Sequence, residues 1–295
     1  MSLRASGRND YYDSFLAMRI YVLALNEVFD RCRSVHKQDK EKVTSQDAGR
    51  EGGRVKSLKL GTDLYQAVAN WFTGRTRGKV LDVGTGDGRL TSCLDSLGYT
   101  IEACDCIPET QWHLKNISYT QCDFAEGLPF EDETFDYVVC TEVIEHVENP
   151  FALCREIKRV LRPGGGVIMS TPNILNMRSR FKFLLDGSFL FYNYPPIEWD
   201  QKEGRPQVHA YPIRYHELEY YLYKAGLTVD ETFTNLRSYS WRLFFPMELL
   251  LRLHARHMEK RSRRKDGVAL ERIYSRVLSD DLLFGTHLIV HATRS

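Results

Sequence analysis

The sequence predicts an α/β fold in which helices cover both faces of a doubly wound, seven-stranded, mostly parallel sheet. From Gly78 onward, short apolar runs alternate with segments of helical pattern. These runs are apolar on both faces, which suits parallel strands buried between two layers of helices. The expected strands cover residues 79–83, 100–105, 117–123, 136–141, 166–171, 227–233 and 285–294.

Helices are expected on either side of these strands. Apolar residues at helical spacing predict a helix over 11–33, and the polar stretch 36–56 that follows is expected to be a flexible linker. A second helix is expected from Asp63 to Phe72, before Thr73-Gly74.

Capping residues mark the helices between the strands. Asn149 can cap a helix, Pro150 suits its first position, and Arg162-Pro163-Gly164 ends it. Gly98 and Gly226 each follow a helical run, where a left-handed cap favours glycine.

Charge and cysteine content limit the class of protein. The chain has 40 basic and 39 acidic residues, a net charge of +1, which argues against nucleic acid as a partner. Its 7 cysteines form no CxxC pair and predict reduced thiols. No stretch reaches the ~18 apolar residues that a membrane span requires. We therefore expect a soluble, cytoplasmic protein, and its oligomeric state stays open.

A glycine-rich turn joins the first strand to the next helix. Val80 to Gly88 read VLDVGTGDG, and glycines there let the backbone pass close to a ligand. A dinucleotide-binding loop would carry a third glycine where this chain has Arg89. The spacing therefore disfavours a pyrophosphate ligand.

The segment from Asp82 to Gly88 resembles the first motif of class I S-adenosylmethionine-dependent methyltransferases, and the resemblance continues over residues 78–235. It implies a Rossmann-like domain whose glycine turn bends around the methionine part of the cofactor. It also implies that Asp105 accepts the ribose hydroxyls, and that Asp123 and Phe124 read the adenine. The implied cofactor-binding residues are Asp82, Gly84, Thr85, Gly86, Gly88, Asp105, Cys106, Asp123, Phe124 and Thr141.

An aspartate at a strand end is, by itself, more often a cap or turn residue than a ligand contact. The prediction rests on the ordered set. With it we expect a helical N-terminal extension with a flexible linker over 1–75 and a class I methyltransferase domain over 76–295. That domain is expected to include an acceptor-side loop over 186–214 and a helical insertion over 236–280.

The segment TEVIEHV follows the fourth strand. If it is helical, Glu142, Glu145 and His146 share one face, and His209 lies in the expected acceptor-side loop. The pattern is similar to ubiquinone-type O-methyltransferases and to small-RNA terminal 2′-O-methyltransferases, which implies a Mg²⁺ or Mn²⁺ site made of these four residues. The alternative is that the acidic residues only interact with the helix dipole.

The same segment offers a base for methyl transfer to a hydroxyl group. His146, with Glu145 beside it, is the candidate catalytic residue, although a histidine here can equally serve as a structural hydrogen-bonding residue. Thr171-Pro172-Asn173 resembles methyltransferases of glycan and lipid-linked pathways. We therefore expect O-methylation of a small hydroxylated or glycan/lipid-linked acceptor. Terminal RNA 2′-O-methylation and a non-catalytic cofactor-binding accessory role are the alternatives.

Residues 241–265 join an apolar run to seven basic residues, which only Glu259 opposes. One interpretation is a peripheral contact with an anionic membrane surface. The other is a packed helix with a solvated basic end.

Overall fold

The computed structural model describes residues 64–192, 209, 211–238, 245–262 and 268–295. The helix expected over 11–33 and the linker expected over 36–56 lie outside these residues. The helix expected to end at Phe72 is present as α2, Leu64–Phe72.

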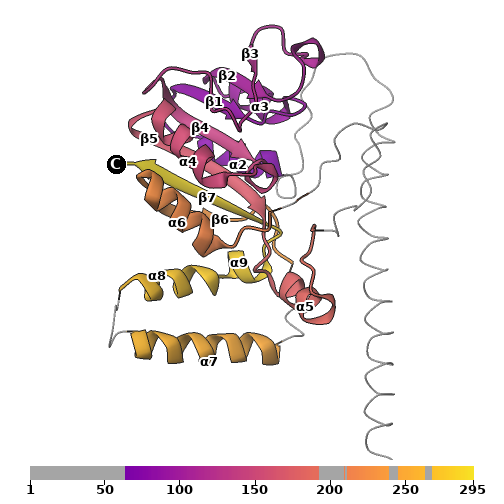
Figure 1. The fold of residues 1–295 in the computed structure, drawn as a ribbon, viewed down its shortest axis with the longest axis vertical. Helices are drawn as coiled ribbons and strands as arrows, with labels where there is room; N and C mark the ends of the chain where they lie inside the picture. Colours follow the sequence, from indigo (N-terminus) through magenta and orange to yellow (C-terminus); the bar gives the residue numbers. More distant parts are fainter. Residues whose placement is uncertain (1–63, 193–208, 210, 239–244, 263–267) are drawn as a thin grey trace, which may run out of the picture. The chain divides into compact units, whose positions relative to one another are not determined.

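One sheet of seven strands organises the described chain (Figure 1), as the sequence predicts. Its order is β3-β2-β1-β4-β5-β7-β6. The first five strands pair in parallel, and β7 is antiparallel to both β5 and β6. The strands are β1 Lys79–Val83, β2 Thr100–Asp105, β3 Ser118–Gln121, β4 Phe135–Thr141, β5 Leu161–Pro172, β6 Leu227–Phe233 and β7 His287–Arg294.

Helices pack on both faces of this sheet, so the doubly wound arrangement is confirmed. The helices after α2 are α3 Arg89–Ser96, α4 Pro150–Val160, α5 Met177–Asp186, α6 Tyr215–Ala225, α7 Phe245–Ser262, α8 Val268–Val277 and α9 Asp280–Phe284, with the short 3₁₀ helices η1 Glu109–Gln111 and η2 Ile144–His146. Helix α2 packs with α3, and α4 packs with α6. Neighbouring strand residues point to opposite layers: Leu81 belongs to the core beneath α4 and α6, and Val80 to the core beneath α2 and α3.

The predicted caps are present. The Asn149 side chain accepts a hydrogen bond from the Ala152 N–H at 3.0 Å, and Pro150 opens α4. Gly98 and Gly226 have φ values of 86° and 88°, so each takes the left-handed conformation expected after a helix.

The segment after β4 is not the regular helix on which the shared face of Glu142, Glu145 and His146 depended. Only Ile144–His146 form a 3₁₀ turn, and Glu142 has a left-handed φ of 56°. The Glu142 N–H donates to the Ser170 carbonyl of β5 at 3.2 Å, which holds it to the sheet instead of starting a helix.

In the sequence, helices α7, α8 and α9 come between β6 and β7. Helices α7 and α8 fall within residues 236–280, where the helical insertion was expected, and α9 extends beyond them. Each helix among the described residues is too short or too polar to cross a bilayer.

Gly84 is the first position at which the fold can be tested. Its φ is 74°, and a Cβ there would lie 2.1 Å from Val143 Cγ2. We expect Gly84→Ala to lower the free energy of unfolding by more than the roughly 1–2 kcal/mol that a left-handed alanine costs. Urea denaturation measures the loss.

Gly74→Ala is the matched control. Gly74 has a φ of 78°, and nothing lies within 4 Å of a Cβ built there, so only the backbone cost applies. Equal losses in the two variants would contradict the close contact between Gly84 and Val143.

Candidate active site

The glycine turn between β1 and α3 forms one side of the site. Gly84, Gly86 and Gly88 all have positive φ values, 74°, 54° and 76°. The Gly84 N–H donates to the Cys104 carbonyl of β2 at 2.8 Å, which holds the turn against the neighbouring strand. A Cβ at Gly86 would meet nothing within 4 Å, so the turn has open space at its tip. Such a bend of exposed backbone can receive a ligand closely.

Asp82 lies beneath this turn. Its side chain is buried, and its Oδ2 accepts hydrogen bonds from the hydroxyls of Thr91 at 2.5 Å and Thr85 at 3.2 Å. Burial raises the pKa of Asp82 to about 6, and the two hydroxyls oppose that rise. Asp82 and Thr85, both predicted to bind the cofactor, are therefore placed as supports of the turn.

Asp105 ends β2 beside the glycine turn. Its Oδ2 accepts a hydrogen bond from the Gly86 N–H at 2.8 Å, and its Oδ1 accepts one from the Ile107 N–H at 3.4 Å. A carboxylate has about four lone-pair sites, so it can accept further hydrogen bonds from a ligand. Cys106, the next predicted residue, is exposed.

Trp112 and Leu114 flank Gly88, and the sequence did not single them out. A Cβ at Gly88 would lie 2.9 Å from Leu114 Cδ1 and 3.2 Å from the Trp112 ring. The Trp112 ring stacks on Tyr119 of β3 with centroids 4.8 Å apart. An aromatic side chain in an irregular loop carries no sequence motif, and only its packing against Gly88 identifies it.

Asp123 and Phe124 follow β3, which ends two residues before the acid. Asp123 is exposed, and its Oδ1 accepts the Ala125 N–H at 2.9 Å. Phe124 is half-buried and packs against the core beneath α4 and α6. Thr141, also predicted to contact the cofactor, is buried at the end of β4.

Glu145, His146 and His209 come together on the other side of the site. One ligand atom from each lies within 4.8 Å of the other two. The ring centroids of His146 and His209 are 4.8 Å apart. The Tyr211 N–H donates to the Glu145 main-chain carbonyl at 3.2 Å. The segment after β4 is thus joined to the segment before α6.

Glu145 is buried, and neither carboxylate oxygen has a hydrogen-bond partner among the described residues. Burial, followed by the charge of Glu142, raises the pKa of Glu145 well above its usual range. Burial and the neighbouring His146 lower the pKa of His209, so its ring is neutral near pH 7. The Glu145 carboxyl group therefore lies beside two imidazoles and has no hydrogen-bond partner among the described residues.

Glu142 does not lie in this three-residue group. The Ser170 hydroxyl donates to its Oε1 at 2.9 Å, and its Oε2 lies 3.6 Å from His287 Nε2. Burial raises the pKa of Glu142 to about 7. The Glu142 carboxyl group nevertheless lies close enough to Glu145 for its charge to raise the pKa of Glu145.

His287, the first residue of β7, is a site residue that the sequence did not predict. Its side chain is 19% exposed, and its Nδ1 lies 3.0 Å from Asn235 Oδ1. Its ring stacks on Phe191 with centroids 5.9 Å apart. Burial lowers the pKa of His287 to about 4, so the ring is neutral at pH 7.

Two backbone outliers meet at His287. Glu142 and Phe191, which both contact it, have φ values of 56° and 70°; among the described non-glycine residues only Glu133 shares this conformation. Left-handed non-glycine residues cost about 1–3 kcal/mol each and concentrate at functional sites. His287 thus contacts two of the three described non-glycine residues that have a positive φ.

Comparison with known proteins identifies the family. Residues 81–169 match a family model described as a methyltransferase domain. A ubiquinone biosynthesis O-methyltransferase from Pseudomonas fluorescens is 32% identical over 181 residues, which cover 57% of this chain and 74% of that relative. One from Acinetobacter baumannii is 28% identical over 175 residues, which cover 55% and 70%.

Among solved structures, an S-adenosylmethionine-dependent methyltransferase from Archaeoglobus fulgidus has a TM-score of 0.48 at 14% identity, covering 78% of this chain and 94% of that one. The assignment rests on the 32% sequence identity to the Pseudomonas enzyme across 74% of that enzyme's length. This chain belongs to the S-adenosylmethionine-dependent methyltransferases.

Proposed function

We propose that the enzyme methylates a hydroxyl group of a small acceptor. Two features support this: the open glycine turn beside Asp105, and the buried Glu145 carboxyl facing two histidines across the site. The two sequence relatives from Pseudomonas fluorescens and Acinetobacter baumannii are both named O-methyltransferases. Glycan and lipid-linked hydroxyls remain within the proposed acceptor class. These relatives favour neither RNA methylation nor a non-catalytic role.

The residues around the glycine turn fit the cofactor. The open space at Gly86 admits the backbone-facing part of a ligand, and Asp105 keeps lone pairs for the ribose hydroxyls. Asp123 and Thr141 are the other proposed contacts, while Phe124 and Trp112 supply apolar surface. When bound, S-adenosylmethionine supplies a methyl group on a sulfonium, an already activated leaving group.

The acceptor side has to orient a hydroxyl group and remove its proton. A neutral His209 can accept a proton, and His146, exposed and 4.8 Å away, is the second candidate base. Orientation contributes as well, because a fixed acceptor avoids the entropy cost of a bimolecular step. The main-chain carbonyl of Glu145, which accepts the Tyr211 N–H, joins the two segments that carry these histidines.

The same three residues also fit a divalent cation. A carboxylate whose two oxygens lack partners and two imidazoles offer oxygen and nitrogen ligands, which suit Mn²⁺ or, with more oxygen ligands, Mg²⁺. A cation bound to Glu145, His146 and His209 would lower the pKa of an acceptor hydroxyl. Glu142, held by Ser170, would lie outside this set.

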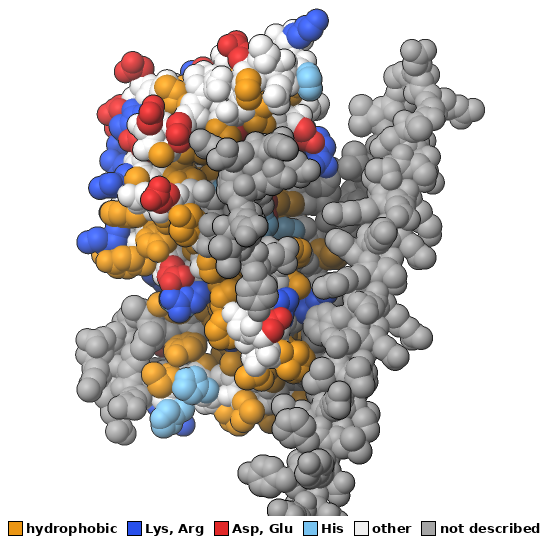
Figure 2. Space-filling model, turned by 45° about the vertical axis from the view of Figure 1, so that its right-hand side comes forward, with side chains coloured by type: hydrophobic (Ala, Val, Ile, Leu, Met, Phe, Trp, Pro, Cys, Tyr) orange, Lys and Arg blue, Asp and Glu red, His pale blue; other side chains and the backbone are white. Residues whose placement is uncertain are grey.

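A peripheral membrane contact through α7 is part of the proposal. Phe245 and Leu250 are 62% and 66% exposed, and Arg252 and Arg256 follow on the same helix. Figure 2 shows hydrophobic side chains open to solvent on the described part of the chain. Residues 263–265, which carry three of the seven basic side chains, lie outside the described part. Apolar and basic side chains together favour an anionic lipid surface.

Product analysis tests the reaction. The enzyme is incubated with deuteromethyl S-adenosylmethionine and separate phenols, sugars and amines. Mass spectrometry is expected to find the label on hydroxyl oxygen. Label found only on nitrogen or carbon would contradict O-methylation.

Asp105 tests the cofactor side. We expect Asp105→Ala to weaken S-adenosylmethionine binding about 10- to 100-fold, because a hydrogen bond to a charged group contributes about 1.5–3 kcal/mol. Calorimetry with S-adenosylhomocysteine measures this without turnover. Asp87→Ala is the control, since Asp87 is exposed in the same turn and pairs with Arg89. Unchanged affinity in Asp105→Ala would remove Asp105 from the site.

Manganese binding tests the cation site. Wild-type enzyme is expected to bind Mn²⁺ in an electron paramagnetic resonance titration, and Glu145→Gln and His209→Ala to bind it at least about tenfold more weakly. His113→Ala changes an exposed histidine outside the group and should bind Mn²⁺ like wild type. If methyl transfer is also indifferent to EDTA, His146 and His209 act as bases without a metal.

His287 tests the acceptor side. Removing the His287 side chain removes its contacts with Phe191 and Glu142, so both residues can shift. Misplacement of a group in the site by about 1 Å can lower the rate up to about 100-fold. We therefore expect His287→Ala to lower kcat while its affinity for S-adenosylhomocysteine stays unchanged. His291→Ala, on the same strand beside Trp71, is the control and should keep kcat. Equal losses of kcat in both variants would show that His287 only stabilises β7.

A further inference from the structure

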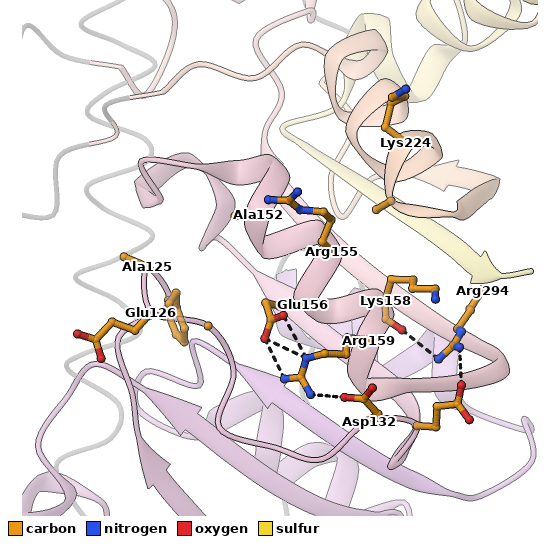
Figure 3. A pocket seen from close by; sticks show the side chains of 14 residues that line it. Ala125, Glu126, Asp132, Ala152, Arg155, Glu156, Lys158, Arg159, Lys224 and Arg294 are labelled. Atoms are coloured by element: carbon orange, nitrogen blue, oxygen red, sulfur yellow. Dashed lines mark hydrogen bonds and ion pairs between the residues drawn. The ribbon is translucent and has the colours of Figure 1, made fainter.

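A groove of about 580 Å³ lies on the α4 and α6 side of the sheet. The loop after β3 forms one wall, α4 another, and the end of α6 and Arg294 of β7 complete it (Figure 3). Of its lining residues, only Phe124 also belongs to the proposed cofactor site. Its volume is that of a pocket for a small organic ligand.

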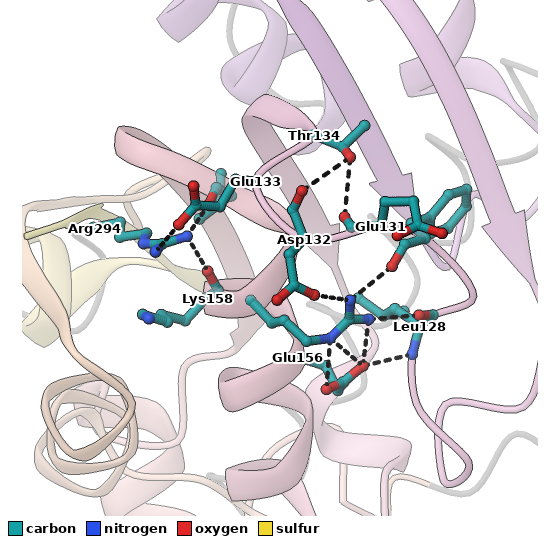
Figure 4. Close-up of polar contacts among 11 residues, drawn as sticks. Leu128, Glu131, Asp132, Glu133, Thr134, Glu156, Lys158 and Arg294 are labelled. Atoms are coloured by element: carbon teal, nitrogen blue, oxygen red, sulfur yellow. Dashed lines mark hydrogen bonds and ion pairs between the residues drawn. The ribbon is translucent and has the colours of Figure 1, made fainter.

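The groove's acidic side chains are largely neutralised. Arg159 forms ion pairs with Asp132 at 2.7 Å and Glu156 at 2.8 Å. Arg294 pairs with Glu133 at 2.6 Å, as Figure 4 shows. Three of the four carboxylates in the lining are therefore already paired with arginine.

Three other cations in the lining are not paired in this way. Arg155, Lys158 and Lys224 form no ion pair with a carboxylate among the described residues, and Glu126 is the one lining acid left to oppose them. Arg155 and Lys158 stand one turn apart on α4, and Lys224 belongs to the last turn of α6, which packs on α4. The lining as a whole carries five cations and four carboxylates, so its net charge is +1, and the three cations without ion pairs among the described residues stand on α4 and α6.

The rest of the lining is apolar. Phe124 and the methyl groups of Ala125, Ala152 and Ala225 also line the groove. A guanidinium and two ammonium groups suit a phosphate, and the apolar wall suits an organic body. We propose that this groove binds a small phosphorylated organic molecule.

The groove's walls are already held in place. Arg159 donates to the carbonyls of Leu128 and Phe130, each at 2.7 Å, besides its ion pairs. Glu156 Oε2 accepts the Leu128 N–H at 3.0 Å. A ligand would therefore enter a formed site and would not need to order the loop, which lowers the cost of binding.

Calorimetry with phenyl phosphate tests the proposal, with phenol at equal concentration as the probe that lacks the charge. Saturable binding of phenyl phosphate is expected, and none of phenol. In the triple variant Arg155→Gln, Lys158→Gln and Lys224→Gln, we expect the affinity to fall at least tenfold. S-adenosylhomocysteine at saturation should leave the binding of phenyl phosphate intact.

The matched control removes three exposed cations elsewhere: Arg77→Gln, Lys115→Gln and Arg256→Gln. It changes the net charge equally and should keep the wild-type affinity. Lys158→Gln alone, with an intermediate loss, replaces the triple variant if that protein does not fold. Absent binding, equal loss in the control, or displacement by S-adenosylhomocysteine would each overturn the proposal.

Discussion

The close contact between the glycine turn and the segment after β4 determines where both halves of the site lie. Val143 Cγ2 lies 2.1 Å from the place where a Cβ on Gly84 would stand, so the Val143 side chain packs directly on the Gly84 backbone. Beneath the contact, Asp82 joins Thr85 and Thr91 through one buried carboxylate. A buried charge is tolerated only with such partners, which makes the turn and the start of α3 a single unit.

This contact has a consequence for the acceptor side. After β4 the chain passes Glu142 and Val143. Glu142 takes a left-handed conformation, and its N–H donates to the Ser170 carbonyl of β5. The antiparallel β7 then brings a third strand to the same place. Because β7 runs opposite to β5, its first residue, His287, lies where β5 ends: its register partner is Pro172. The acceptor side is thus assembled from the ends of two parallel strands and the beginning of an antiparallel one.

Local sequence signals explain what could be predicted, and strand order explains what could not. The strands, the caps at Asn149 and Gly226 and the glycine turn follow from local signals, namely apolar periodicity and residue preferences. The grouping of Glu145 with His146 and His209 also followed from a motif. His287 could not be found in this way, because its place depends on β7 being inserted between β5 and β6. The left-handed backbone conformation of Glu142 is likewise indicated by no residue pattern.

The loop after β3 shows how a segment without regular structure can still support a precise site. Its backbone is fixed from outside, because the Arg159 guanidinium reaches two of its carbonyls and Glu156 reaches one of its N–H groups. Charged hydrogen bonds of this kind are stronger than neutral ones. Asp123 and Phe124 stand at the start of the same loop. The loop that begins with the proposed adenine contacts is therefore held by α4 as well as by β3.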